Sequence, residues 1–159
     1  MLHVNIICVG KIKESFFRDA IDEYKKRLSR FCSLNIIEIP DEKIPDNSSL
    51  KIEEQIKIKE GNSIISHLVP NSFNIALDLS GKEFSSEDLA SYINNISISN
   101  SSITFIIGGS LGLSKDVLNT CDFKISFSKL TFPHQLIRIF LLEQLYRSFK
   151  INNNEKYHK

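Results

Sequence analysis

Five short apolar segments alternate with segments of helical periodicity along the chain, and this alternation constrains the fold more than any other feature of the sequence. The apolar segments are rich in Ile, Val and Phe, and most end at a glycine, a proline or a polar residue, as buried strands do. We place strands at residues 2–9, 34–39, 73–79, 103–107 and 123–127. Because strands that alternate with helices form βαβ units, we predict an α/β fold with a mostly parallel sheet and helices on both of its faces.

The segments between these strands carry apolar residues three and four positions apart, which predicts amphipathic helices. We expect helices at residues 14–28, 49–68, 85–95, 114–120 and 133–150. Ser85 and Ser114 are suited to cap the third and fourth helices, and Thr131 to cap the fifth. Gly61 should weaken the second helix.

One domain, residues 1–159, accounts for the whole chain, because its length matches the roughly 100–200 residues of a typical domain. A hydrophobic content of 42% excludes a disordered or low-complexity chain. The net charge of +1 gives no overall attraction to nucleic acid, so a polyanionic partner would have to meet a local basic patch. Residues 136–159 form the basic stretch, with five basic residues and two acidic ones.

The three cysteines, Cys8, Cys32 and Cys121, are widely separated and have no histidine at metal-ligand spacing. We therefore expect neither a disulfide framework nor a bound metal. The chain enters its first strand without a charged leader, and no apolar stretch approaches the roughly 18–20 residues of a membrane span. These features predict a cytoplasmic protein that does not enter the membrane.

The last helix has no broad polar face, so it must be covered on more than one side. We expect a second subunit to cover one side in a homodimer, with Leu141, Leu145 and Phe149 as a candidate interface stripe. The alternative is a fully buried central helix. Arg138 and Arg147 each need a carboxylate or phosphate partner on this apolar helix, and Glu143 is a candidate partner within it.

Ligands of an open parallel sheet bind beyond the carboxyl ends of its strands. Three segments of unusual composition follow such ends, at residues 77–82, 108–112 and 128–134. The segment 108–112 holds half of the chain's six glycines, which would serve either a close approach to a ligand or a tight turn.

The same five residues match the G-x-S-x-G elbow of serine hydrolases. In that interpretation Ser110 would be the nucleophile, followed by Asp116 or Asp122 and then by His134 or His158. The chain is short for that fold and offers no segment for a second oxyanion donor, so this interpretation is the weaker one. A dinucleotide site is weaker still, since the segment is not GxGxxG and does not open the first βα turn.

Three strings carry a family resemblance: LDLSGKEFSSEDLA (77–90), FIIGGSLGLS (105–114) and LTFPHQLIRIFLLEQLYRSFKINNNEKYHK (130–159). Their order, the chain length and the YHK ending resemble the RlmH family, bacterial methyltransferases that modify N3 of a pseudouridine in 23S rRNA within the SPOUT superfamily. The resemblance implies a C-terminal trefoil knot that holds S-adenosyl-L-methionine. The positions that would bind this methyl donor are Leu77, Gly109, Ser128, Lys129, Leu130, Thr131, Phe132 and Pro133.

The reaction requires the imide N–H of the pseudouridine to lose its proton. His158 is the candidate base because an ordinary imidazole titrates at about pH 6.5. Tyr157 and Arg147 are candidate catalytic partners that would position the substrate or stabilise its charge. We expect a homodimer with the donor site in one subunit and the other subunit's tail completing the substrate site, acting on 23S rRNA within the ribosome. The rival function is a non-catalytic RNA-binding or ribosome-binding module. Candidate RNA contacts are Lys150, Lys156 and Lys159, together with Lys25, Lys26, Arg27 and Arg30.

Overall fold

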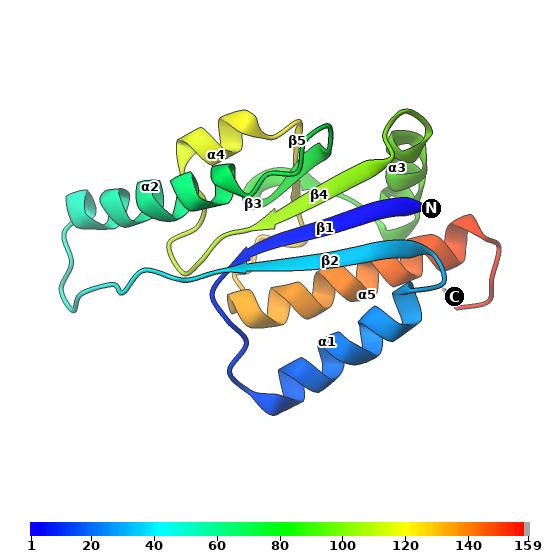
Figure 1. The fold of residues 1–159 in the computed structure, drawn as a ribbon, viewed down its shortest axis with the longest axis horizontal. Helices are drawn as coiled ribbons and strands as arrows, with labels where there is room; N and C mark the ends of the chain where they lie inside the picture. Colours follow the sequence, from blue (N-terminus) through cyan, green and yellow to red (C-terminus); the bar gives the residue numbers. More distant parts are fainter. Residues whose placement is uncertain (158–159) are drawn as a thin grey trace.

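The computed structural model describes residues 1–157, which form one five-stranded sheet. Its strands are β1 (Leu2–Val9), β2 (Cys32–Ile39), β3 (Phe73–Glu83), β4 (Ser102–Ile107) and β5 (Phe123–Ser126). They lie in the order β2-β1-β4-β3-β5, and every neighbouring pair is parallel (Figure 1). The predicted α/β fold is confirmed, and the sheet is parallel throughout.

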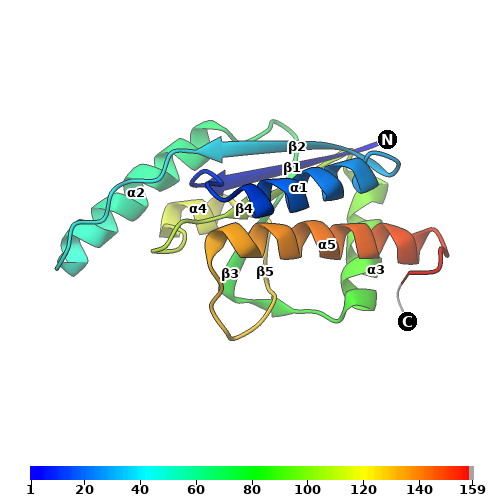
Figure 2. The same cartoon turned by 90° about the horizontal axis from the view of Figure 1, so that it is seen from below.

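Five helices cover the two faces of this sheet. They are α1 (Ser15–Leu28), α2 (Leu50–Ser66), α3 (Ser86–Ser99), α4 (Lys115–Thr120) and α5 (His134–Asn152). Two hydrophobic cores result, one on each face of the sheet. One contains the buried apolar residues of α1, α3 and α5, and the other contains those of α2 and α4. Strand β1 serves both cores, because Ile6 and Cys8 point to one face and Ile7 and Val9 to the other. Helices therefore cover both faces, as predicted (Figures 1 and 2).

The serine caps are present where the sequence predicts them. Ser85 Oγ accepts a hydrogen bond from Asp88 N at 3.1 Å, and Ser114 Oγ accepts one from Val117 N at 3.3 Å. The predicted Thr131 cap is wrong, since α5 begins at His134 after Pro133, and no side chain caps it. Proline fixes the backbone angle at the helix entrance and has no N–H to satisfy, so a capping hydroxyl two residues earlier has no role.

Strand β3 extends four residues beyond the predicted end, to Glu83. Its pairing with β5 shifts register between Leu77 and Lys82, which both pair with Ile125. The intervening residues bulge, and Asp78 Oδ2 accepts a hydrogen bond from Ser80 N at 3.0 Å. Gly81 lets the strand return to β5, because a Cβ there would lie 2.5 Å from the carbonyl carbon of Ile125.

Helix α5 packs on the sheet between α1 and α3, beside α1 in both views (Figures 1 and 2). Leu141 and Leu145 are each 1% exposed and belong to the core of the subunit with Phe149. The suggested interface stripe of Leu141, Leu145 and Phe149 is therefore wrong. The sheet and the two flanking helices cover most of α5. This arrangement is closer to the alternative expectation, a fully buried central helix. Phe140 is the large apolar side chain of α5 that stays 36% exposed.

Within residues 1–157, no helix has the length and apolar character needed to span a membrane.

The thiols of Cys8 and Cys32 are buried, and burial raises their pKa values to about 11 and about 12. Protonated, enclosed thiols of this kind are not nucleophiles.

Candidate functional site

A cavity of about 400 Å³ opens at the carboxyl ends of β3, β4 and β5. The three segments singled out in the sequence converge there, one from each strand end, and supply most of its wall. Such an edge of a parallel sheet is the usual position of a ligand site. A cavity of this volume lies within the range of small-molecule and cofactor sites, about 300–1,000 Å³.

Six of the eight residues expected to bind the methyl donor line this cavity. They are Leu77, Gly109, Ser128, Leu130, Thr131 and Phe132. Lys129 and Pro133 are exposed and lie outside the lining. The donor site therefore remains a prediction, but one whose residues come from three distant parts of the chain and share one cavity.

The glycine-rich segment presents its backbone to the cavity through a tight turn. Gly112 N donates to Gly109 O at 3.0 Å, and Gly112 has a φ of +83°, in the left-handed region. A Cβ on Gly108 would lie 2.8 Å from the carbonyl carbon of Gly112. The tight turn therefore explains the clustered glycines, while their close approach to a ligand stays a prediction for a segment that lines the cavity.

Gly109 is constrained from behind the cavity wall. A Cβ built on Gly109 would lie 3.2 Å from Val9 Cγ1 and 3.3 Å from Glu60 Oε1. Val9 belongs to the core, and Glu60 is buried. A side chain at position 109 would therefore press on these two residues and move the segment, instead of simply filling the cavity.

The segment between β5 and α5 is shaped by its serines. Ser128 Oγ accepts a hydrogen bond from Leu130 N at 3.0 Å, and Ser126 Oγ donates to the Ser128 carbonyl at 2.9 Å. These bonds fold the segment back over the cavity. Phe132 then packs edge-on against Phe140 of α5, with ring centroids 5.3 Å apart.

His134 lies at the first turn of α5 and lines the cavity. Burial, with a smaller effect from the positive charge of Arg138, lowers the pKa of His134, so its imidazole is neutral at pH 7. Gly10 makes room for the ring, because a Cβ there would lie 3.0 Å from His134 Nε2. His134 thus fills a niche between the cavity and the end of β1.

The serine hydrolase interpretation finds no support in this geometry. Within residues 1–157, no hydrogen bond joins Ser110 to a histidine, although Ser110 and His134 line the same cavity. Asp122 lies at the amino end of β5 and accepts a hydrogen bond from Asn74 N at 2.7 Å. Asp116 is exposed in the first turn of α4. Among the residues that the structure describes, no carboxylate is hydrogen-bonded to His134 to orient it toward Ser110.

A second polar cluster forms around Glu143 on the outer side of α5. Glu143 Oε2 accepts hydrogen bonds from Tyr24 Oη at 2.6 Å and Tyr157 Oη at 3.0 Å. Arg147 Nη2 donates to Glu143 Oε1 at 2.7 Å, and its guanidinium lies 4.8 Å from the centroid of the Tyr157 ring. Two candidate catalytic residues, Arg147 and Tyr157, therefore share one carboxylate.

Burial and the hydrogen bond to Glu143 raise the pKa of Tyr157 above its usual value. The hydroxyl is therefore protonated at neutral pH and is a hydrogen-bond donor, unsuited to remove a proton. His158, the candidate base, lies outside the described residues.

Glu143 is not the partner of Arg138, contrary to the sequence-based suggestion. Arg138 Nη1 lies 2.9 Å from Glu38 Oε2, on β2, and Nη2 donates to the Gly10 carbonyl at 3.0 Å. The sequence separation between Arg138 and Glu38 hides this pair from any local pattern.

The two polar regions lie far apart within one subunit. His134 marks the cavity end of α5, and Arg147 lies 13 residues further along the same helix. At 1.5 Å per residue this spacing corresponds to about 20 Å along the helix axis. Neither Arg147 nor Tyr157 lines the cavity of its own subunit.

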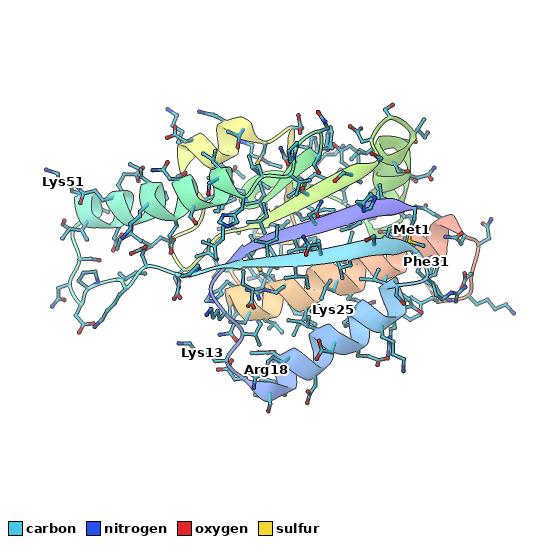
Figure 3. The ribbon with its side chains drawn as sticks, viewed as in Figure 1. Met1, Lys13, Arg18, Lys25, Phe31 and Lys51 are labelled. Carbon is cyan, nitrogen blue, oxygen red and sulfur yellow. The ribbon has the colours of Figure 1, made fainter. Side chains whose placement is uncertain are left out.

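Several basic residues expected to contact RNA are paired within the subunit. Arg27 lies 2.8 Å from Glu23, and Arg30 lies 3.0 Å from Glu155, which also contacts Lys150. Lys25, 3.9 Å from Asp22, is on the same side of the molecule as Lys13 and Arg18 (Figure 3). Lys26 and Lys156 are exposed, and Lys159 lies outside the described residues.

Sequence reasoning missed two residues near the cavity. Lys57 of α2 lines it, and Glu60 lies behind Gly109. The helical periodicity gave no signal for Lys57, because a lysine is typical of any helix surface. For Glu60 the available signal was the glycine that follows it inside a helix, since such a glycine can mark close packing.

Comparison with known proteins agrees with the geometry. Residues 2–158 match the family model described as "Predicted SPOUT methyltransferase". The chain is 59% identical to the ribosomal RNA large subunit methyltransferase H of Clostridium botulinum strain Hall over 99% of this chain and 100% of that protein. Ribosomal RNA large subunit methyltransferase H from Clostridium novyi is 58% identical, with the same coverage.

A solved structure supports the fold independently. It is described as a probable methylase family protein from Haemophilus influenzae Rd KW20, and it superposes with a TM-score of 0.56 at 14% identity. The superposition covers 100% of this chain and 72% of that one. The full-length family match and the high identity to the clostridial relatives establish that the chain belongs to the SPOUT methyltransferase family.

Proposed function

We propose that this protein transfers a methyl group from S-adenosyl-L-methionine to N3 of a pseudouridine in 23S rRNA. The observation that carries the proposal is the convergence of the three family-like segments on one cavity of about 400 Å³ at the carboxyl edge of the sheet. The proteins named ribosomal RNA large subunit methyltransferase H, at 58–59% identity, support the same reaction class and substrate.

The residues present fit such a donor. Leu77, Phe132 and Ile137 give the cavity an apolar wall suited to an adenine ring. The turn at Gly109–Gly112 and the segment 128–132 present backbone groups that can bind polar edges of the donor. In this proposal the bound donor supplies a methyl group on a positively charged sulfur. The trefoil knot implied by the resemblance belongs to the same proposal.

The acceptor nitrogen must be deprotonated before it can accept the methyl group. His158 is the proposed base, because an ordinary imidazole has a pKa of about 6.5 and can hold a proton at neutral pH. Tyr157 keeps its own proton and donates it in a hydrogen bond to Glu143, so its proposed role is to position Arg147 and the substrate and not to act as the base. Arg147 supplies positive charge that stabilises the deprotonated imide.

The separation of the two clusters supports a site shared by two subunits. Since about 20 Å of α5 separates His134 from Arg147, the tail of a second subunit would bring Arg147, Tyr157 and His158 to the donor cavity. The exposed ring of Phe140, beside Phe132, offers an apolar contact at the cavity end of α5. We propose a homodimer in the cytoplasm that acts on the assembled ribosome.

Mass spectrometry of rRNA tests this function directly. Cells that lack the gene should lack one methyl group in 23S rRNA, and ribosomes from those cells should regain it when incubated with purified protein and S-adenosyl-L-methionine. Binding of the protein to these ribosomes without methyl uptake would favour the rival function, a non-catalytic ribosome-binding module. Methyl uptake at a residue other than pseudouridine would overturn the proposed substrate.

A further inference from the structure

Glu60 and Gly61 lie where α2 packs against the segment between β4 and α4. Gly61 allows the close approach, because a Cβ at this position would lie 2.3 Å from Ser114 Oγ. Glu60 is only 6% exposed, whereas Glu54 on the same helix is exposed. Burying a carboxylate costs free energy unless hydrogen bonds compensate for the lost water. The buried position of Glu60 therefore calls for hydrogen-bond donors near its carboxylate.

The Glu60 carboxylate lies between two loops. Its Oε2 accepts a hydrogen bond from the backbone N of Glu42 at 3.0 Å, in the loop between β2 and α2. Its Oε1 faces Gly109, where an added Cβ would lie 3.3 Å away. A second cavity of about 230 Å³ separates the loops and is lined by both, with Glu60 and His134 in its wall. Glu60 is therefore hydrogen-bonded to a loop outside the donor cavity and fills the space directly behind Gly109, which forms part of the cavity wall.

We propose that Glu60 is a positioning residue for methyl-donor binding: held by its hydrogen bond to the Glu42 loop, its carboxylate supports Gly109 from behind the cavity wall. The inference rests on the proposed function, since the position of Gly109 matters to activity only if the cavity binds the donor. Backbone groups of the 108–112 segment face the cavity together, so a small displacement of the segment changes all of their contacts at once.

Calorimetry with S-adenosylhomocysteine tests the proposal, with thermal melting of each variant alongside. Glu60→Ala removes both contacts and should raise the Kd at least about tenfold. Glu60→Gln keeps the shape of the side chain and an acceptor for the Glu42 N–H, so its Kd should stay within about twofold of the wild type. In methylation of ribosomes, Glu60→Ala should raise the KM for the donor and retain kcat at saturating donor.

Glu53→Ala is a matched control on the same helix. Glu53 also connects α2 to the loop before it, by accepting a hydrogen bond from Ser48 Oγ at 2.8 Å, but unlike Glu60 it is not among the neighbours of Gly109. Its Kd should match that of the wild type. If Glu53→Ala weakened binding as much as Glu60→Ala, the effect would be general loosening of α2, and the proposal would be overturned.

A folded Glu60→Ala variant that binds S-adenosylhomocysteine as tightly as the wild type would overturn this inference alone. A wild type that binds none would overturn the proposed function with it. If Glu60→Ala does not fold, Glu60→Asp takes its place, because it withdraws the carboxylate from both loops by one carbon–carbon bond. The same rise in Kd is expected of the aspartate variant.

Discussion

Arg138 and Glu38 form an ion pair between α5 and β2 in which the guanidinium is 1% exposed and the carboxylate is 37% exposed. The Arg138 side chain also donates to the Gly10 carbonyl, so it ties the ends of β1 and β2 to the first turns of α5. His134, one turn earlier on α5, occupies the niche at Gly10. The pair therefore anchors the helix that closes the donor cavity.

The two partners should differ in the cost of their removal. Glu38→Ala leaves a buried guanidinium without its carboxylate and should lower the free energy of unfolding by about 3–5 kcal/mol. Arg138→Met replaces the buried charge by an apolar chain of similar length and leaves only a partly exposed carboxylate, so the loss should be smaller. Urea denaturation measures both. Equal losses would contradict the view that the cost comes from the unpaired buried charge.

Gly109→Val should weaken binding of S-adenosylhomocysteine at least about tenfold, because the branched side chain presses on Val9 and Glu60 and displaces the cavity wall. Calorimetry provides the measurement. Ser110→Ala is the neighbouring control and should leave methyl transfer nearly unchanged, since Ser110 has no hydrogen-bonded histidine within residues 1–157. Covalent labelling of Ser110 by a fluorophosphonate would instead revive the hydrolase interpretation.

Removal of residues 157–159 should abolish methylation of ribosomes and leave the Kd for S-adenosylhomocysteine within about twofold of the wild type. The reason is the distance of Tyr157 and its Glu143 cluster from the subunit's own cavity. Methyl incorporation and calorimetry on the same preparation separate the two effects. A truncated protein that methylates at the full rate would exclude His158 as the base.

Phe140→Lys should convert the dimer into a monomer at micromolar concentration and reduce methylation, because it places a charge on the exposed apolar surface at the cavity end of α5. Sedimentation velocity measures the association state. Ile98→Lys is the control, since Ile98 is 78% exposed on α3, and it should leave the dimer intact. Leu145→Lys is unsuitable as an interface test, because Leu145 is core and the variant should unfold. A wild type that sediments as a monomer and still methylates ribosomes would refute the shared site.

As the pH rises from about 4 to 7, the free energy of unfolding of Glu60→Gln should increase relative to that of the wild type. Burial, the largest effect, raises the pKa of Glu60, as do the nearby charges of Asp41 and Glu42, while the Glu42 N–H lowers it. The folded state therefore binds this proton more tightly than the unfolded state does, and that contribution is lost as the pH rises through the raised pKa. Lys43 and His134 line the same cavity of about 230 Å³ as Glu60. Both residues are present in the wild type and in the variant, so they do not distinguish the two proteins. Urea denaturation across this pH range measures the difference, and a constant difference would contradict the assignment.

The sequence predicted the strands and most helices because their signals are local. Apolar runs define β1 and β4, and Ser85 and Ser114 define helix starts. It did not predict the continuation of β3, because the bulge before Gly81 depends on contact with Ile125 across the sheet.

The cavity at the carboxyl edge of the sheet could be predicted from three strand ends that a parallel sheet must bring together, and donor binding there stays a prediction. The contacts that support the cavity could not be predicted, because each joins residues distant in sequence. Arg138 meets Glu38 at a separation of 100 positions, and Glu60 meets Gly109 from another helix. Tyr24 of α1 is another example, because its ring packs against the core while its hydroxyl donates to Glu143, 119 positions away.

The single unbroken helix α5 has a consequence for how this chain can vary. One inserted residue between His134 and Arg147 would lengthen the helix by only about 1.5 Å, yet it would turn the far end by about 100° relative to the near end. The fold could absorb that length in the turn after Asn152. The Glu143 cluster could not, because Tyr24 is fixed on α1. An insertion in this helix would therefore break the contacts at its far end through rotation and not through added length.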